Sequence, residues 1–319
     1  MTDGSTTVNA AASQLAATPT TEPTGVMAVL GFLPEMLVLV GVPILLLELF
    51  KLIRGRQLNW HRGSGMLTSL FCMIPSAITR TVAVGAAFAA FAAIAAWTPW
   101  SISTTWMTAI LCLLAVDFAY YWEHRIAHEV NLIWAAYHAT HHSADHYDQT
   151  VAQRISFVSY FVKFTVYLPV AFMGFAPELI VICFFIVLTW QQWLHTETIG
   201  KLPVMDFWFN TPSNHRVHHG RNEQYIDKNY GGMLIIWDRL FGTYAAEVEP
   251  VDYGLVEQNY SRNPLAVHFA PFGKLMKEWG TTETLRERLI LLFGKPGALA
   301  GHRAQTASPS VGSNQTLAA

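Results

Sequence analysis

The chain has 319 residues, a formal charge of −2, 52 % hydrophobic and 13 % charged residues, and a mean hydropathy of +0.29. This composition indicates a membrane protein. It lacks a basic run, so it offers no surface for nucleic acid, and we expect no such partner. Its cysteines lie in apolar runs without a C-x-x-C pair, which excludes a disulfide framework and a cysteine-ligated metal site. They are Cys72, Cys112 and Cys183.

The chain is expected to have a single membrane domain over residues 26–295, flanked by tails. Residues 1–25 and 303–319 are polar and rich in Thr, Ser and Ala, so we expect them to be disordered. Between the tails, apolar runs approach the ~20 residues that span a bilayer. These runs are residues 27–50, 82–98, 103–122, 156–173 and 177–194. The predicted fold is an all-α integral membrane protein with about four to five transmembrane helices.

Residues 66–81 contain Pro75 and Arg80, and we expect this stretch to be interfacial or re-entrant rather than a clean span. Positive charge sets the orientation of the spans, because cytoplasmic loops are enriched in Lys and Arg. Basic residues follow the first span and end the third, whereas the N-terminal tail has none. They are Lys51, Arg54, Arg56, Arg62 and Arg125. The N-terminal tail is therefore predicted to face outward, and the ends of the third and fifth runs to be cytoplasmic.

Histidines gather at those cytoplasmic ends. His124 and His128 are spaced i, i+4, and two later clusters repeat the spacing i, i+3, i+4, so a helix would turn each set of rings to one face. The candidate metal ligands are His124, His128, His138, His141, His142, His195, His215, His218 and His219. So many imidazoles provide ligands for two metal ions.

The remaining histidines stand alone. We interpret His61, His268 and His302 as structural residues, and for His146 the two interpretations stay open.

Several motifs together resemble the fatty acid hydroxylase and sterol desaturase superfamily of membrane di-iron enzymes. They are "DFAYYWEHRIAH", "HATHHS", "WLHTE", "NTPSNHRVHHGRN" and "DKNYGGMLIIWDRLFGTY". Within the superfamily, residues 210–244 are most similar to the alkylglycerol monooxygenase branch. The resemblance implies a cytoplasmic helical cap that holds two Fe ions, O2 as co-substrate, and hydroxylation or desaturation of a lipid drawn from the bilayer. It also places the superfamily's ligands on the histidines named above.

One position departs from the superfamily. Some members have a further histidine four residues before the one that matches His195, and here that residue is Gln191. Either one ligand is missing, or a carboxylate such as Glu197 or Asp206 substitutes for it.

The chain has no glycine-rich dinucleotide fingerprint and no cysteine set for an iron–sulfur cluster, so an external electron donor is expected. The resemblance leaves a b-type cytochrome, a ferredoxin or a reduced pterin as the donor. The sequence leaves the oligomeric state unknown.

Some polar residues could support the site. Asp117 lies seven residues before His124 on the same helical face, where its carboxylate could orient an imidazole. Asn214 and Asn229 are more typical of turns and caps. Residues 263–293 mix apolar and basic positions, as helices do that lie on the membrane surface or cover a site.

Two other classes compete with a lipid oxygenase or desaturase. A zinc-dependent membrane lipid hydrolase also uses clustered histidines, but its site usually includes several carboxylates. A metal transporter would place its ligands near the middle of the spans. The almost pure imidazole clusters at span ends favour the oxidoreductase, with an insertion of oxygen preferred to desaturation.

Overall fold

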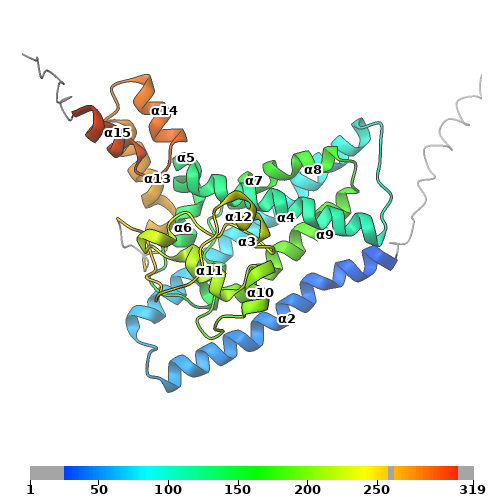
Figure 1. Ribbon diagram of the computed structural model, residues 1–319, viewed down its shortest axis with the longest axis horizontal. Coiled ribbons are helices and arrows are strands. Elements are labelled where there is room, and N and C mark those ends of the chain that lie inside the picture. Colours follow the sequence, from blue (N-terminus) through cyan, green and yellow to red (C-terminus); the bar gives the residue numbers. More distant parts are fainter. Residues whose placement is uncertain (1–24, 258–261, 308–319) are drawn as a thin grey trace, which may run out of the picture.

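The computed structural model describes residues 25–257 and 262–307, which form helices and loops without a β-strand (Figure 1). For these residues the prediction of an all-α fold is confirmed. Two isolated bridges, Phe209 to Leu234 and Gly220 to Tyr253, join loops near the histidine clusters. The expected tails lie largely outside the described residues.

Long helices form the main bundle. They are α2 (Gly25–Arg54), α3 (Trp60–Trp97), α4 (Trp106–Glu129) and α9 (Pro177–Trp190). Helix α9 packs against both α2 and α4, and α2 runs along one edge of the molecule (Figure 1). Small buried residues at the helix contacts let the backbones approach closely, which is how helices associate in a bilayer. Examples are Ala83, Ala87, Ala109 and Cys112.

Local sequence explains where these helices begin. Asn59 caps α3 by accepting a hydrogen bond of 2.9 Å from the backbone N–H of Arg62. Thr105 and Thr108 form a reciprocal capping box at the start of α4. Both caps satisfy N–H groups that a helix leaves without an internal partner.

The structure corrects two of the predicted segments. Residues 66–81 are not a separate re-entrant segment but the first half of α3, which continues through Pro75 to Trp97. Residues 156–173 are divided into short pieces, namely α7 (Ser159–Lys163), η3 (Phe164–Tyr167) and α8 (Leu168–Phe172).

Only two helices in the described part of the chain are long and apolar enough to cross a membrane by length and composition. They are Trp60–Trp97 and Pro177–Leu194. The apolar helix Ser159–Phe172 is shorter than the ~20 residues that a span needs.

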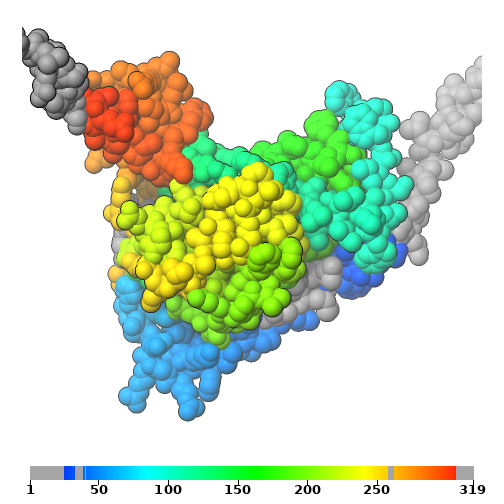
Figure 2. Space-filling view, in the orientation of Figure 1, coloured from blue at the N-terminus to red at the C-terminus, as the bar shows by residue number. Residues whose placement is uncertain are grey.

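Shorter elements surround the histidine clusters. They are α5 (Asn131–Ile133), η1 (Trp134–His138), α6 (Ala139–His142), η2 (Gln149–Gln153), η4 (Gln191–Leu194), α10 (Pro203–Trp208), α11 (Pro212–His219), η5 (Glu223–Tyr225) and α12 (Ile236–Phe241). In the space-filling view, the residues that follow α9, green to yellow, cover the front of the bundle (Figure 2).

The last three helices form what we call the C-terminal arm, residues 266–307. It consists of α13 (Ala266–Trp279), α14 (Leu285–Phe293) and α15 (Ala298–Ala307). A small core of Ala135, Leu275, Leu291 and Leu299 joins the arm to η1. Helix α15 extends to Ala307, so the first residues of the segment expected to be a disordered tail are helical.

Candidate metal centre

Five elements bring the predicted histidines together. The last two turns of α4 provide His124 and His128, and α11 provides His215, His218 and His219. His195 directly follows η4. The remaining three come from η1 and α6, where η1 is a π-helical turn. Such turns are frequent at functional sites because the extra residue redirects the side chains.

The nine candidate ligands fall into two groups whose nitrogen atoms lie within 4.8 Å of one another. The first histidine group is His124, His128, His138, His142 and His218. The second histidine group is His141, His195, His215 and His219. The groups adjoin each other, since the rings of His142 and His219 stack with their centroids 4.4 Å apart. The structure therefore brings all nine predicted histidines together.

Ring nitrogens face each other within both groups. In the first group, Nε2 of His124 lies 3.2 Å from Nε2 of His138, and Nε2 of His142 lies 3.0 Å from Nε2 of His218. In the second, Nε2 of His195 lies 3.3 Å from that of His141 and 3.1 Å from that of His215. Ligands at about 2.1 Å from one ion are separated by about 3.0 Å in octahedral and about 3.4 Å in tetrahedral geometry. The observed separations match the edges of such coordination polyhedra.

In the pair His141 and His195, the hydrogen bonds show which ring nitrogen carries the proton. Nδ1 of His195 lies 3.1 Å from the carbonyl oxygen of Gln191, and Nδ1 of His141 lies 3.3 Å from that of Arg154. A carbonyl oxygen only accepts, so each Nδ1 carries the proton and each Nε2 is bare in the neutral ring. Two lone pairs facing at this distance repel each other, and a cation between them removes the repulsion.

Burial keeps these rings neutral. It lowers the pKa of His195 to about 4 and holds the pKa values of His138, His142 and His218 well below their usual range. Neutral imidazole is the form that binds metal. In addition, Nε2 of His128 and Nε2 of His219 are buried without a hydrogen-bond partner, as expected for nitrogen atoms that coordinate a metal ion.

A single loop, residues 227–230, orients three rings of the first group. The carbonyl oxygen of Tyr230 lies 2.8 Å from Nδ1 of His124, and that of Lys228 lies 3.0 Å from Nδ1 of His218. Asp227 provides a carboxylate oxygen 3.7 Å from Nδ1 of His128. Sequence analysis missed this role, although the loop belongs to the quoted motif "DKNYGG".

Asp117 does not orient an imidazole directly, so this prediction is corrected. Its Oδ1 accepts a hydrogen bond of 2.7 Å from the backbone N–H of Met233, and its Oδ2 accepts from the N–H of Leu234 at 3.1 Å and from Nε1 of Trp237 at 2.9 Å. The carboxylate thus holds residues 233–237, which follow the 227–230 loop, against α4 by hydrogen bonds.

Two further residues hold the same loop. Asp238 accepts hydrogen bonds from the backbone N–H groups of Tyr230 and Gly231, each at 2.7 Å. Asn229 has a left-handed φ of 58°, and its side chain bonds to the carbonyl oxygens of Asn214 and Ala245. Asn229 is therefore architectural.

The side chain of Asn214 also bonds to carbonyl oxygens, those of Asp206 and Phe209, as expected for a residue that caps turns.

The residues considered for the missing ligand are engaged elsewhere. Gln191 accepts a hydrogen bond of 2.6 Å from the Tyr120 hydroxyl, and Asp206 accepts from Thr211. Glu197 accepts from Tyr253 at 3.3 Å. None of the three candidates joins a histidine group among the described residues.

The other histidines lie outside both groups. His61 pairs with Asp145 at 2.9 Å on the surface, and His146 contacts Asp145 and Asp148. His268 packs against Phe157.

A buried charged pair beside the histidines was not anticipated. Nζ of Lys163 lies 3.6 Å from Oε2 of Glu123, whose other oxygen accepts a hydrogen bond from the Tyr137 hydroxyl. A lysine within an apolar run was a signal that could have revealed it. Lys163 lines a narrow cavity of about 30 Å³, which His138 and His141 line as well.

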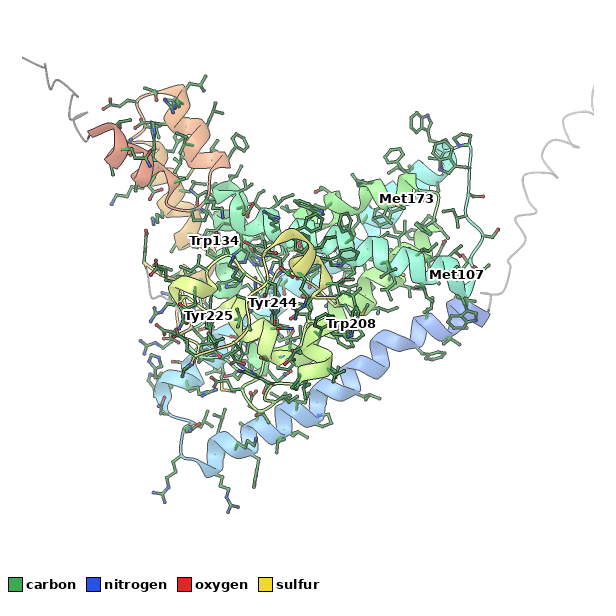
Figure 3. The ribbon with its side chains drawn as sticks, viewed as in Figure 1. Met107, Trp134, Met173, Trp208, Tyr225 and Tyr244 are labelled. Carbon is green, nitrogen blue, oxygen red and sulfur yellow. The ribbon has the colours of Figure 1, made fainter. Side chains whose placement is uncertain are left out.

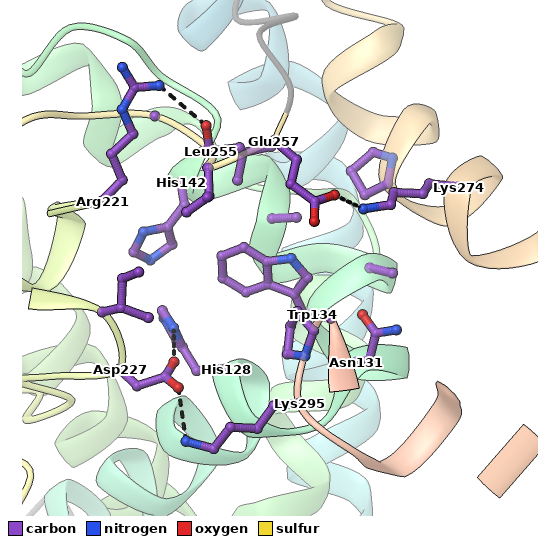
Figure 4. Close-up of a pocket in the computed structure, with 18 of the residues that line it drawn as sticks. His128, Asn131, Trp134, His142, Arg221, Asp227, Leu255, Glu257, Lys274 and Lys295 are labelled. Carbon is purple, nitrogen blue, oxygen red and sulfur yellow. Dashed lines mark hydrogen bonds and ion pairs between the residues drawn. The ribbon is translucent and has the colours of Figure 1, made fainter. Parts of the chain in front are cut away.

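A larger cavity of about 360 Å³ also adjoins the histidines (Figure 4). Its lining includes ligand candidates from both groups, His128 and His142 from the first and His219 from the second. Trp134 forms one wall, with its ring centroid 5.0 Å from that of His128. Lys274 and other residues of the C-terminal arm form the facing wall (Figure 4). This volume is in the range of small-molecule sites.

Comparisons with known proteins agree with the geometry. Residues 109–243 match the family model described as fatty acid hydroxylase. The chain therefore carries a domain of the fatty acid hydroxylase family, and the resemblance inferred from the histidine motifs is confirmed. No solved structure matches the chain.

Among curated relatives, the chain is similar to alkylglycerol monooxygenases. It is 39 % identical to that of Xenopus tropicalis over 245 residues, which is 76 % of this chain and 54 % of the relative. It is 42 % identical to that of Homo sapiens over 193 residues, or 60 % of this chain and 42 % of the relative. The ornithine lipid hydroxylase OlsE of Rhizobium tropici is 31 % identical over 137 residues, or 42 % of this chain and 41 % of the relative. The chain thus spans about half the length of these relatives or less.

Proposed function

We propose that this protein hydroxylates a lipid with O2 at a histidine-held di-iron centre, using electrons from a separate donor. The observation that supports this most strongly is the arrangement of two adjoining imidazole groups with bare nitrogens turned toward each other. The relatives support the reaction class, since they are named for hydroxylation of alkylglycerols and ornithine lipids.

Imidazole nitrogens, the donor atoms of both histidine groups, are suitable ligands for redox-active metal ions. The first histidine group would hold one iron ion and the second group the other. Two adjacent irons supply the electron transfers that O2 needs before it can attack an unactivated C–H bond. Neither group contains a carboxylate, which distinguishes them from typical zinc hydrolase sites.

The protein's own residues bind and shield the substrate. Trp134, Leu255 and Leu275 give the larger cavity apolar walls next to the histidines, which would hold the reacting hydrocarbon and keep water away. Polar groups lie at its rim, among them Lys274 and Glu257 (Figure 4). The substrate class that fits is a lipid such as an alkylglycerol, a fatty acyl lipid or a sterol.

We further propose that the chain is a multi-pass membrane protein with a helical cap and its histidines on the cytoplasmic face. A b-type cytochrome, a ferredoxin or a reduced pterin would then deliver electrons from the cytoplasm. The basic residues Lys51, Arg54 and Arg56 support this side, since they are exposed at the turn between α2 and α3.

Labelled oxygen tests the proposal. Purified iron-loaded protein in lipid nanodiscs is incubated under 18O2 with each lipid class, and each of the three donors is supplied in turn. The balanced reaction is RH + O2 + two electrons + two protons → ROH + H2O, so mass spectrometry should detect one 18O atom in the lipid product and none with His215→Ala. An unsaturated product without label would contradict hydroxylation. Cleavage of a lipid ester without O2 in zinc-loaded protein would support the hydrolase instead.

A further inference from the structure

Asp227 differs from the other groups that orient the first histidine group. Lys228 and Tyr230 act through backbone carbonyl oxygens, whereas Asp227 acts through its side chain. Its backbone is left-handed, with a φ of 59°, and this turn directs the carboxylate toward His128. The interaction with His128 is therefore the one in this loop that a substitution can remove without altering the backbone hydrogen bonds.

His128 is a ring whose tautomer depends on a carboxylate partner. Its Nδ1 lies 3.7 Å from Oδ1 of Asp227, and its Nε2 is buried without a hydrogen-bond partner. A carboxylate near Nδ1 favours the tautomer with the proton on that nitrogen. Nε2 is then bare and directed into the first histidine group.

The carboxylate is held in turn by the C-terminal arm. Nζ of Lys295 lies 2.9 Å from Oδ2 of Asp227 and 3.6 Å from Oε1 of Glu129 (Figure 4). Asn131 fixes the chain just before this lysine, because it hydrogen-bonds to the carbonyl oxygens of Leu291 and Gly294, each at 2.9 Å. Lys295 thus connects the arm to a metal-ligand candidate through a single carboxylate.

We propose that Asp227 is a positioning residue for His128 and that Lys295 couples docking of the C-terminal arm to the first metal position. Lys295 lies outside residues 109–243, which match the family model, so the arm adds a support to the centre from beyond that match. This inference rests on the proposed metal centre. It assigns the arm a role in metal retention in addition to lining the cavity.

Substitutions of Asp227 and Lys295, each with a matched control, test this inference. Asp227→Asn keeps the size of the side chain but removes its charge, and Lys295→Met removes the cation. The controls are Asp252→Asn and Lys274→Met, which break ion pairs with Arg221 and Glu257 that do not touch a histidine. Iron per chain and its rate of loss to a chelator are measured for every variant, with circular dichroism of the metal-free proteins as a check on folding.

We expect Asp227→Asn to weaken iron binding on the order of 10–100-fold, as loss of a partner that orients a ligand does elsewhere. One of the two ions should leave, and the ion of the second histidine group should stay. Lys295→Met should accelerate loss of the same ion by a smaller factor, because the carboxylate remains, and the controls should match the parent.

The inference is overturned if Asp227→Asn retains as much iron as the parent. It is also overturned if the two control variants lose iron as fast as Asp227→Asn does. A parent that binds no iron would overturn the proposed function as well, whereas an iron-loaded parent with unaffected variants overturns this inference alone. If Asp227→Asn fails to fold, Lys295→Met decides, because the side chain of this lysine is 54 % exposed.

Discussion

At the scale of single residues, hydrogen bonds at Nδ1 set the state of the metal-ligand candidates. His124, His195 and His218 each have a backbone carbonyl oxygen at Nδ1. The carbonyls fix the tautomer and direct Nε2 inward, and burial in apolar surroundings keeps the rings uncharged. Protons and metal ions therefore compete for the same nitrogens.

This competition predicts a pH dependence. Burial lowers the pKa of His195 to about 4, below the usual value of 6.5, so the unfolded chain binds a proton there more readily than the folded chain. The contribution of His195 to the stability of the metal-free protein should be constant above about pH 6.5 and should decrease as the pH falls toward 4. Chemical unfolding across this range measures the effect. Stability that rises as the pH falls through this window would contradict the assignment of neutral buried rings.

Asp117→Asn tests whether the hydrogen bonds of Asp117 to the chain after the 227–230 loop support the histidines. The amide keeps one acceptor but presents an NH2 group to donors that now bond to Oδ2, those of Leu234 and Trp237. We expect a loss of about 1–3 kcal/mol in the free energy of unfolding, with weaker iron loading because the 227–230 loop loosens. Glu178→Gln, at an exposed acid of α9, is the control. Iron content and stability equal to the parent would contradict the role of Asp117.

At the scale of elements, close packing behind the 227–230 loop holds the site together. A Cβ on Gly232 would lie 2.7 Å from Cδ1 of Tyr120, 2.8 Å from Cγ1 of Val187 and 2.9 Å from Oδ1 of Asp117. The loop can reach α4 and α9 only because this residue has no side chain. The glycine pair in "NYGGM" is thus explained by close approach between backbones and helices.

Gly232→Ala should destabilise the protein by about 1–3 kcal/mol, since the contacts leave no space for a methyl group. The matched control is Gly273→Ala in α13, where a Cβ meets nothing within 4 Å. That change should be neutral or should stabilise the helix by about 0.5–1 kcal/mol. Thermal unfolding of both variants measures the difference, and equal stability of the two would show that the loop does not pack as described.

Sequence patterns predicted some elements better than others. Imidazole spacing grouped eight of the clustered histidines, because i, i+3, i+4 positions share a helical face whatever the tertiary structure. His195 has no such neighbour, and only its place at the end of the fifth apolar run added it to the set. The same periodicity placed Asp117 on the helical face of His124 but could not show that Met233 and Trp237 donate hydrogen bonds to its carboxylate. Asp227 was missed because its contact depends on a left-handed turn and on α4, almost a hundred residues earlier in the chain (His128 to Asp227).

At the scale of the whole molecule, exposed tryptophans lie at both ends of the bundle, with Trp60 beside the turn between α2 and α3. Trp97, Trp100 and Trp106 are exposed near the connection between α3 and α4, as aromatic residues are at membrane interfaces. Figure 1 places this connection and the α2–α3 turn at opposite ends of the bundle, and in Figure 3 Met107 and Met173 lie far from Trp134, which adjoins the histidines. This separation supports the proposed membrane orientation.

Continuity of the helices was hard to predict from the sequence. Pro75 suggested an interruption, but α3 continues through it to Trp97. The docking of the C-terminal arm also depends on distant contacts, such as that of Thr140 with the carbonyl oxygen of Val267 at 2.8 Å. Local composition indicated helices there, but it could not show that they line the cavity.

The most direct test of the account is the metal content of the purified protein, with Mössbauer spectra after iron loading, in the parent and in His141→Ala. The account predicts two irons per chain, one for each histidine group, with the signal of a coupled pair that His141→Ala loses. A single tightly held zinc with no uptake of iron would contradict it.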